Sequence, residues 1–188
     1  MKKIILATVC IVVVSMIAIS AFAAEYDLVI KSGRVMDPET KYDRIANVGI
    51  KNGTIAIITN KSIKGKETID ATGHVVAPGF IDIHAHGQNI GDYRMQEALR
   101  KMCLMPAQTL EGFVPQMKTK GRLQEGMDAD IVVFDPETIS DVGTYEAPNQ
   151  PAVGVQSLLV NGTLVVADGK LVLDAASGQP IRRPIKKQ

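Results

Sequence analysis

The chain has few cysteines and no excess of charge of either sign. Only Cys10 and Cys103 occur among its 188 residues. Cys10 lies in an apolar N-terminal run, so the rest of the chain holds a single cysteine and an intrachain disulfide is excluded there. The 21 basic and 20 acidic residues nearly cancel, which argues against a nucleic-acid partner.

The N-terminal run lacks charge as well. Lys2 and Lys3 precede an uncharged stretch, residues 4–24, which ends in the small-residue pattern AFA. A basic start, an apolar middle and a small-residue end are typical of a secretory signal peptide. We therefore expect residues 1–24 to be cleaved, and the protein to be periplasmic or secreted without membrane contact. An uncleaved anchor is the alternative, because the run is long enough to cross a bilayer.

Short β-branched runs separated by turn residues make up both ends of the remaining chain. The first end reads YDLVIKSGRVMD, ANVGIKNGTIAIIT and ETIDATGHVVAPG, a pattern that predicts strands of a small sheet. Asn52-Gly53 tolerates positive φ at both central positions, as a type I′ hairpin requires. The second end reads ADIVVFD and VQSLLVNGTLVVADGKLVLD, where two more such pairs predict a three-strand meander.

Neither β-rich end can bury a core alone, because each offers only three or four short strands. We expect a mainly β fold in which residues 25–78 and 130–174 form the two parts of one small β-sandwich. Between them, EALRKMCLMPAQTLE carries apolar residues at helical spacing until Pro106 breaks or kinks the helix. The basic, proline-containing residues 175–188 are expected to be a flexible tail.

The stretch FIDIHAHG, residues 80–87, places His84 and His86 two positions apart. On a strand both imidazoles point to the same face, so they can reach one metal ion. A hydrolytic zinc site needs at least three protein ligands and an open position for water. Only one other histidine, His74, is present in the chain.

The combined motifs resemble the metal-dependent amidohydrolase superfamily, and especially its N-acyl-D-amino-acid deacylase branch. The resemblance rests on VIKSGRVMDPET, IDATGHVVAPGFIDIHAHG, LMPAQTLE, GRLQEGMDADIVVFDPET and LLVNGTLVVADGKLV, which cover most of the chain in two blocks. It implies a β-sandwich beside a (β/α)8 barrel, with zinc held by His84 and His86 at the end of the first barrel strand. Asp82 matches the strand pattern of the family rather than a ligand.

The chain departs from this family in the length of its middle segment. Residues 87–129 separate the two histidines from the returning sandwich strand, whereas a full barrel takes ~250 residues and one strand-helix-strand unit ~30 or more. We therefore expect residues 79–129 to be a truncated α/β remnant of the barrel, with the histidine strand and one helix. No residue is assigned a catalytic role.

Three other side chains could extend the site, and the sequence favours a structural role for each. His74 falls in an expected strand of the sandwich. Cys103 lies on the apolar face of the expected helix, which favours a buried thiol over a ligand. Asp130 belongs to the acidic turn before IVVF, not to the position of the family's catalytic aspartate. Because two neutral imidazoles alone hold zinc weakly, we expect zinc to be weakly bound or absent.

The resemblance implies a zinc-dependent hydrolase of non-peptide amide bonds, with an N-acyl amino acid as its small-molecule substrate. Because the base and most of the pocket are missing, we expect this shortened chain to be inactive. Two alternatives stay open: a secreted noncatalytic β-sandwich that serves as an interaction module, and a half-site completed by another chain. Oligomer formation is compatible with each of these.

Overall fold

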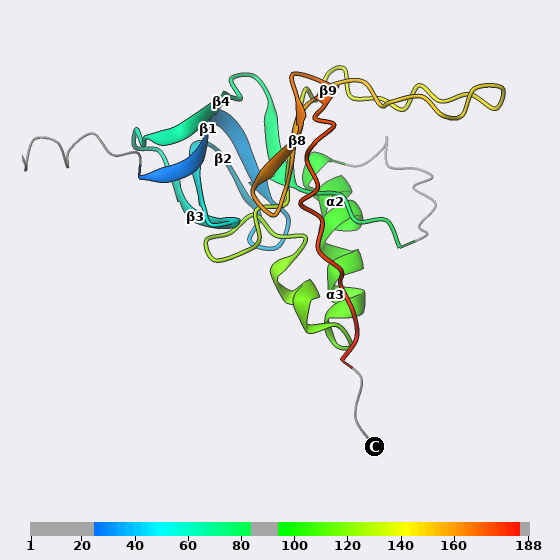
Figure 1. The fold of residues 1–188 in the computed structure, drawn as a ribbon, viewed down its shortest axis with the longest axis horizontal. Coiled ribbons are helices and arrows are strands. Elements are labelled where there is room, and N and C mark those ends of the chain that lie inside the picture. Colours follow the sequence, from blue (N-terminus) through cyan, green and yellow to red (C-terminus); the bar gives the residue numbers. More distant parts are fainter. Residues whose placement is uncertain (1–24, 84–93, 185–188) are drawn as a thin grey trace, which may run out of the picture.

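The computed structural model describes residues 25–83 and 94–184 of the chain (Figure 1). In these residues the strands form one sheet and the helical segments lie together beside it, so the predicted mainly β class is confirmed. The strands are β1 (Tyr26–Asp37), β2 (Tyr42–Lys51), β3 (Thr54–Thr59), β4 (Gly65–Asp70), β5 (Val75–Pro78), β6 (Ile131–Phe134), β7 (Val155–Val160), β8 (Thr163–Ala167) and β9 (Lys170–Leu171). The helical segments are α2 (Met95–Leu99), η2 (Arg100–Leu104), α3 (Met105–Glu111) and η3 (Pro115–Thr119).

The strands follow the order β3-β2-β1-β5-β6-β7-β8-β9, and β4 also pairs with β1. This single hydrogen-bonded sheet differs from the two separate sheets of the predicted sandwich. The reason lies in β1, whose register shifts between Ile30 and Gly33, where Ser32 has a φ of 58°. A bulge of this kind bends a strand. The first half of β1 then pairs with β4 and the second half with β5.

A short segment, residues 126–130, closes the curled sheet. Ile55 N donates to Met127 O (2.9 Å), and Ala129 N donates to Gly53 O (2.8 Å). On the other side, Gly162 N donates to Ala129 O (2.9 Å). The β2–β3 and β7–β8 turns therefore face each other across this segment.

The predicted hairpin turns are present. Asn52-Gly53 and Asn161-Gly162 have positive φ at both central positions, as type I′ turns require, and so does the pair before β9. A Cβ on Gly162 would stand 2.8 Å from Gly53 Cα. Glycine at position 162 is thus needed for the close approach of the two turns as well as for its own backbone conformation. The predicted three-strand meander, β7-β8-β9, is confirmed.

The core joins the two β-rich ends of the chain. Ile30 and Val48 from the first end pack with Ile131 and Leu159 from the second, and each is essentially inaccessible to solvent. Burial of such side chains contributes about 1.5–3 kcal/mol each. The antiparallel pairing of β5 with β6 joins the ends directly, and this confirms the prediction that the two ends share one sheet system.

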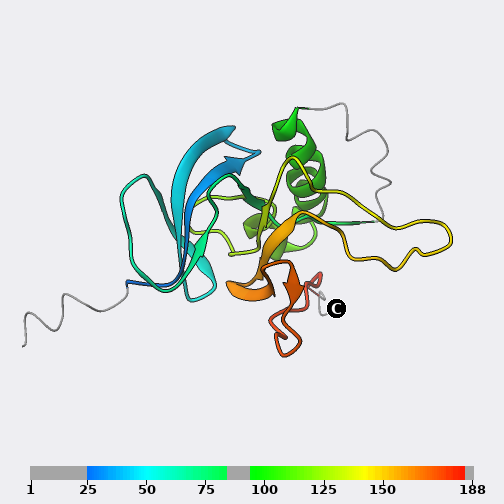
Figure 2. The same cartoon turned by 90° about the horizontal axis from the view of Figure 1, so that it is seen from above.

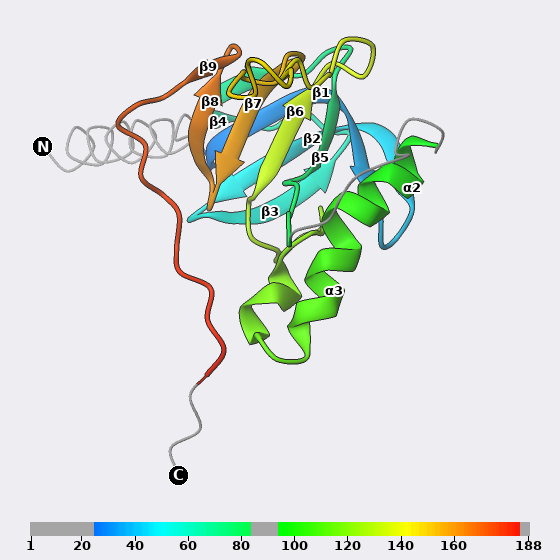
Figure 3. The ribbon, with the colours of Figure 1, turned by 90° about the vertical axis from the view of Figure 1, so that its right-hand side faces the viewer.

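A second apolar cluster lies between the helical segment and the sheet. In Figure 3 the helical segment is seen below one edge of the curled sheet. Leu99 and Cys103 pack there against Met36 and Phe134. No helix within the described residues combines the length and the apolar character needed to cross a bilayer.

The helical segment continues past Pro106, where the sequence predicted a break or a kink. The chain takes a π-helical turn over Arg100–Leu104 and stays helical to Glu111. Because Pro106 has no N–H, it cannot donate to the carbonyl four residues before it, that of Met102. Ile81 N donates to that carbonyl instead, at 2.9 Å. The proline therefore frees an acceptor that binds the segment leading toward the two histidines.

Candidate functional site

The predicted metal ligands His84 and His86 lie outside the described residues. The structure describes the segment that leads to them, residues 79–83, which we call the approach segment. It has no strand pairing in the structure, although the sequence predicted a strand. Single hydrogen bonds hold it instead: Gly79 N donates to Asp130 O (2.8 Å) and Ile81 N to Met102 O (2.9 Å). The described residues form no strand beside this segment, where the sequence predicted a truncated remnant of the barrel.

The approach segment forms one wall of a pocket of about 460 Å³, which we call the approach pocket. Its other walls are mostly apolar side chains of α3, η3, β7 and the C-terminal tail. The residues around it are Gly79, Phe80, Ile81, Asp82, Ile83, Leu110, Val114, Met117, Lys120, Gly121, Asp130, Leu158, Leu159, Val160 and Ile181. Its volume lies within the ~300–1,000 Å³ common for small-molecule sites.

Lys120 and Asp130 form an ion pair at this pocket. Lys120 Nζ lies 2.6 Å from Asp130 Oδ2 and 3.0 Å from Asp128 Oδ2. Burial disfavours the charged ammonium, but the two carboxylates outweigh it and raise the pKa of Lys120. The other oxygen of Asp130 accepts from Asn161 N at 2.7 Å. Asp130 is therefore bound on both oxygens, as the structural role predicted for it requires.

Cys103 is a buried thiol in the structure. It is inaccessible to solvent, and its Sγ donates to Pro78 O at 3.3 Å. Burial, with a smaller contribution from the charge of Asp37, raises the pKa of Cys103 to about 12. Zinc binds the thiolate form, so this side chain is poorly suited to be a ligand.

His74 lies in a bend before β5 and not within a strand, which corrects the expectation from sequence. Ala71 and Gly73 explain the bend: His74 N donates to Ala71 O (2.9 Å), and Gly73 has a φ of 79°. The ring Nδ1 of His74 lies 3.0 Å from Thr72 O. The histidine side chain is thus engaged with its own turn.

No group of three His, Cys, Asp or Glu side chains suited to a metal ion occurs within residues 25–83 and 94–184. A catalytic zinc site needs three protein ligands. The described residues therefore hold no zinc site among themselves, and we assign no catalytic step to zinc in this chain.

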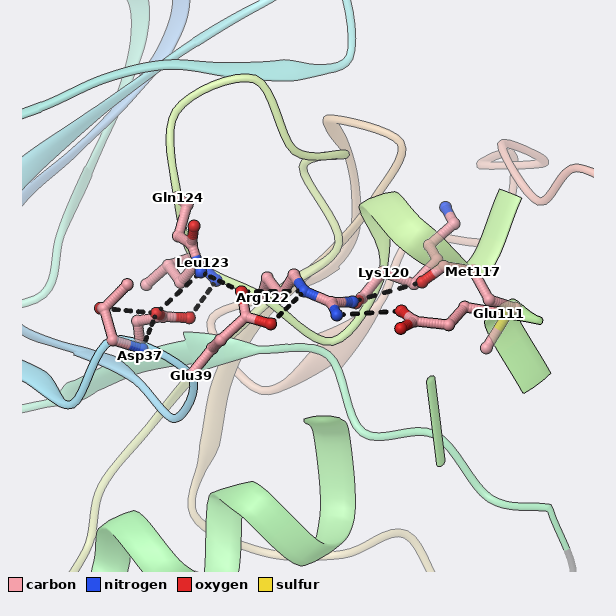
Figure 4. Close-up of polar contacts among 9 residues, drawn as sticks. Asp37, Glu39, Glu111, Met117, Lys120, Arg122, Leu123 and Gln124 are labelled. Atoms are coloured by element: carbon pink, nitrogen blue, oxygen red, sulfur yellow. Dashed lines mark hydrogen bonds and ion pairs between the residues drawn. The ribbon is translucent and has the colours of Figure 1, made fainter. Parts of the chain in front are cut away.

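A buried carboxylate that the sequence did not indicate, Asp37, anchors a polar cluster beside the pocket (Figure 4). Asp37 is inaccessible to solvent, and its Oδ1 accepts from Leu123 N at 2.9 Å. Its Oδ2 accepts from Thr40 N and Oγ1, at 2.9 and 2.7 Å, and from Gln124 Nε2 at 3.0 Å. These bonds connect the β1–β2 turn to the loop that follows η3.

Arg122 extends this cluster to the helical segment (Figure 4). Its Nε lies 3.0 Å from Glu39 and its Nη2 2.9 Å from Glu111 at the end of α3. Nη1 donates to Lys120 O at 3.1 Å. All three guanidinium nitrogens are thus bonded. The cluster binds the helical segment to the sheet.

A repeated tetrapeptide in the sequence could have drawn attention to Asp37. Asp-Pro-Glu-Thr occurs at residues 37–40 and again at residues 135–138. Asp135 accepts from Glu137 N (2.9 Å) and Thr138 Oγ1 (2.8 Å), so both copies form a turn closed by the aspartate. Only in the first copy is the aspartate side chain buried and bonded to distant residues.

Comparison with known proteins gives partial matches, and no family model matches the chain. The dihydroorotase of Streptococcus pneumoniae serotype 4 is 45% identical over 71 residues, 37% of this chain and 17% of that protein. The D-aminoacylase of Alcaligenes xylosoxydans xylosoxydans is 35% identical over 80 residues, 43% of this chain and 16% of that protein. A solved D-aminoacylase, studied for its binuclear metal center, is 31% identical over 52% of this chain and 19% of its own, with a TM-score of 0.45.

The matches to these relatives cover only part of each protein. The chain spans about one sixth of the length of the curated relatives it matches. Both dihydroorotases and D-aminoacylase are found, so the matches support the family more broadly than one branch. In the sequence of the matched residues, this chain is similar to members of the amidohydrolase superfamily, both dihydroorotases and D-aminoacylase.

Proposed function

We propose that the chain carries the sheet domain and the first two zinc ligands of an N-acyl-D-amino-acid deacylase, and that it has no turnover of its own. The observation that supports this most directly is the 35% identity over 80 residues to D-aminoacylase. That match extends over more residues than the 71 matched in the dihydroorotase of Streptococcus pneumoniae, although the dihydroorotase has the higher identity, 45%. The sandwich architecture is part of the same proposal, with the bulged β1 shared between its two layers.

The chemistry of the approach pocket supports the lack of turnover. An amide hydrolase needs a base that is free to move a proton. Two carboxylates line the pocket, Asp82 and Asp130, and Asp130 is bound to Lys120 and to Asn161 N. Cys103 is protonated at neutral pH, because its pKa is about 12.

Export is also part of the proposal. The charged start, apolar middle and small-residue end of residues 1–24 support a signal peptide and a periplasmic or secreted protein. The alternative of a noncatalytic interaction module has its own support, since an exposed arm with Tyr145 at its tip projects from the sheet. A half-site completed by another chain would need that chain to supply the third ligand.

A zinc titration and an activity assay test the proposal together. In calorimetry the chain should bind zinc weakly, with a Kd above the micromolar range, and His84→Ala/His86→Ala should abolish the heat. His74→Ala is the matched control and should leave the binding unchanged, because this ring faces its own turn. With zinc added and several N-acyl-D-amino acids as substrates, hydrolysis should stay at the background rate.

Two results would contradict the proposal. Tight zinc binding that survives the double substitution would mean that the ligands are other residues. Turnover near 1 s⁻¹, of the order common for enzymes, that is lost in the double mutant would show that the chain assembles a working site.

A further inference from the structure

An arm formed by residues 140–153 leaves the body of the molecule and extends well beyond the sheet in Figures 1 and 2. Its base is closed by two backbone bonds, from Ser140 N to Val153 O (3.3 Å) and from Val153 N to Ser140 O (3.0 Å). Gly154 follows with a φ of 80°, and a Cβ there would collide with the backbone of Ile139. The sequence therefore fixes the point where the arm leaves the sheet.

The tip of the arm is ordered by its own hydrogen bonds. Thr144 N donates to Ala147 O (3.1 Å), and Ala147 N donates to Thr144 Oγ1 (3.0 Å). This turn presents Tyr145, whose exposure is 98%. Tyrosine is enriched at protein interfaces, where it buries a large area at a low cost in conformational entropy. A tyrosine held in solvent by an ordered turn is thus suited to bind a partner.

The arm is acidic, and the approach pocket has a basic rim. No lysine or arginine occurs between residues 135 and 169, and the arm itself carries Asp141 and Glu146. The charged residues that line the pocket are Lys120, Asp82 and Asp130. Three exposed basic residues, Lys118, Arg182 and Arg183, directly follow the lining residues Met117 and Ile181 in the sequence. Basic residues thus outnumber acidic ones among the residues that line the pocket or directly follow its lining, and this complements an acidic turn that carries one aromatic ring.

We propose that the arm of one copy of this chain binds the approach pocket of a second copy, with Tyr145 in the pocket and the acidic arm against the basic rim. The arm of the same copy points away from the body (Figures 1 and 2), so the partner is a second molecule. The pocket, at about 460 Å³, has room for one aromatic side chain. This inference is independent of the proposed function, because it needs neither zinc nor turnover.

Sedimentation velocity on the protein produced from the full chain tests the proposal. At ~50 μM we expect assemblies of two or more copies that dissociate on dilution and at high salt. Tyr145→Ala should weaken association at least tenfold. Ile181→Glu should do the same from the pocket side, and this residue is 43% exposed, so the substitution leaves the core intact. Leu173→Ser is the matched control: it removes an apolar side chain that is 87% exposed elsewhere and should change nothing.

A mixing experiment makes the test specific. The Tyr145→Ala copy has an intact pocket and the Ile181→Glu copy an intact arm, so the mixture should form 1:1 complexes that neither variant forms alone. A parent chain that is monomeric at 50 μM would overturn the proposal. Association that Tyr145→Ala leaves unchanged, or mixed variants that stay apart, would also overturn it. A short-chain N-acyl amino acid can also be added to the assemblies. If it binds in the pocket and the assemblies do not dissociate, the pocket is a small-molecule site and the proposal is contradicted.

Discussion

Replacing Asp37 by alanine should destabilise the fold far more than the same change at Asp135. Both residues begin an Asp-Pro-Glu-Thr turn, so the local chemistry is matched. Asp37 is inaccessible to solvent and accepts four hydrogen bonds, whereas Asp135 closes only its own turn with Glu137 and Thr138. The pair of variants therefore separates the effect of burial and distant partners from the effect of the turn.

The magnitude follows from the donors that Asp37→Ala leaves behind. Leu123 N is buried, so leaving it without an acceptor costs about 1–3 kcal/mol. The donors of Thr40 and Gln124 are closer to solvent and can bind water, which adds about 1 kcal/mol for the lost charged acceptor. The free energy of unfolding should thus fall by about 2–4 kcal/mol. For Asp135→Ala we expect a loss of about 1 kcal/mol or less.

Urea unfolding followed by circular dichroism measures both variants. With a slope of ~2 kcal/mol per molar urea for a small domain, Asp37→Ala should move the midpoint down by roughly 1–2 M, and Asp135→Ala by ~0.5 M or less. The urea midpoint of Asp37→Asn should lie between those of the two alanine variants. One oxygen of the asparagine still accepts from Leu123 N, but its NH2 group faces the donors of Thr40 and Gln124 and cannot accept from them. Equal losses at Asp37 and Asp135 would refute the reasoning, since the distant bonds would then contribute nothing measurable.

Two further predictions concern titratable side chains. Cys103 should resist iodoacetamide at pH 8 in the folded chain and react in urea, since its pKa of about 12 leaves roughly one thiol in ten thousand ionised. The labelled fraction can be measured by peptide mass spectrometry. Rapid labelling of the folded protein would contradict the buried position of the thiol. Bonds from Arg34 lower the pKa of Asp43 below its usual 3.8, so the pair stabilises the fold above that pH and loses its effect as pH falls through the lowered value. Asp43→Asn should therefore reduce the acid sensitivity of unfolding below about pH 4, and an unchanged pH profile would argue against the pair.

Features with local causes could be predicted from the sequence. Asn52-Gly53 and Asn161-Gly162 specify type I′ turns through their own backbone preferences, and the structure has both. The union of the two β-rich ends follows from apolar faces that neither end can cover alone. The turns are determined by interactions within a few residues, and the union of the two ends by the burial of apolar surface, which does not depend on particular partners.

Features that depend on distant partners were not predicted. The hydrogen bond from Leu123 N to Asp37 spans 86 residues, and no local pattern marks a carboxylate for burial there. The bulge at Ser32 lies where the pairing of β1 changes from β4 to β5, two strands that follow it in the sequence by more than 30 residues. The helix persists past Pro106 because Ile81, from outside the helix, uses the carbonyl that the proline leaves free. The assignment of His84 and His86 as ligands stays a prediction, as these residues lie outside the described ones.

The antiparallel pairing of β5 with β6 also bears on the length of the connection that the fold tolerates between these two strands. Pro78 and Ile131 are paired neighbours, so residues 79–130 form a loop whose two ends are held together by the sheet. The entropic cost of closing such a loop grows only as the logarithm of its length, and a loop six times longer costs about 1.6 kcal/mol more. That is comparable to the burial of one core side chain. The same sheet can therefore close over a short connection or over an inserted domain of several hundred residues, at nearly the same stability.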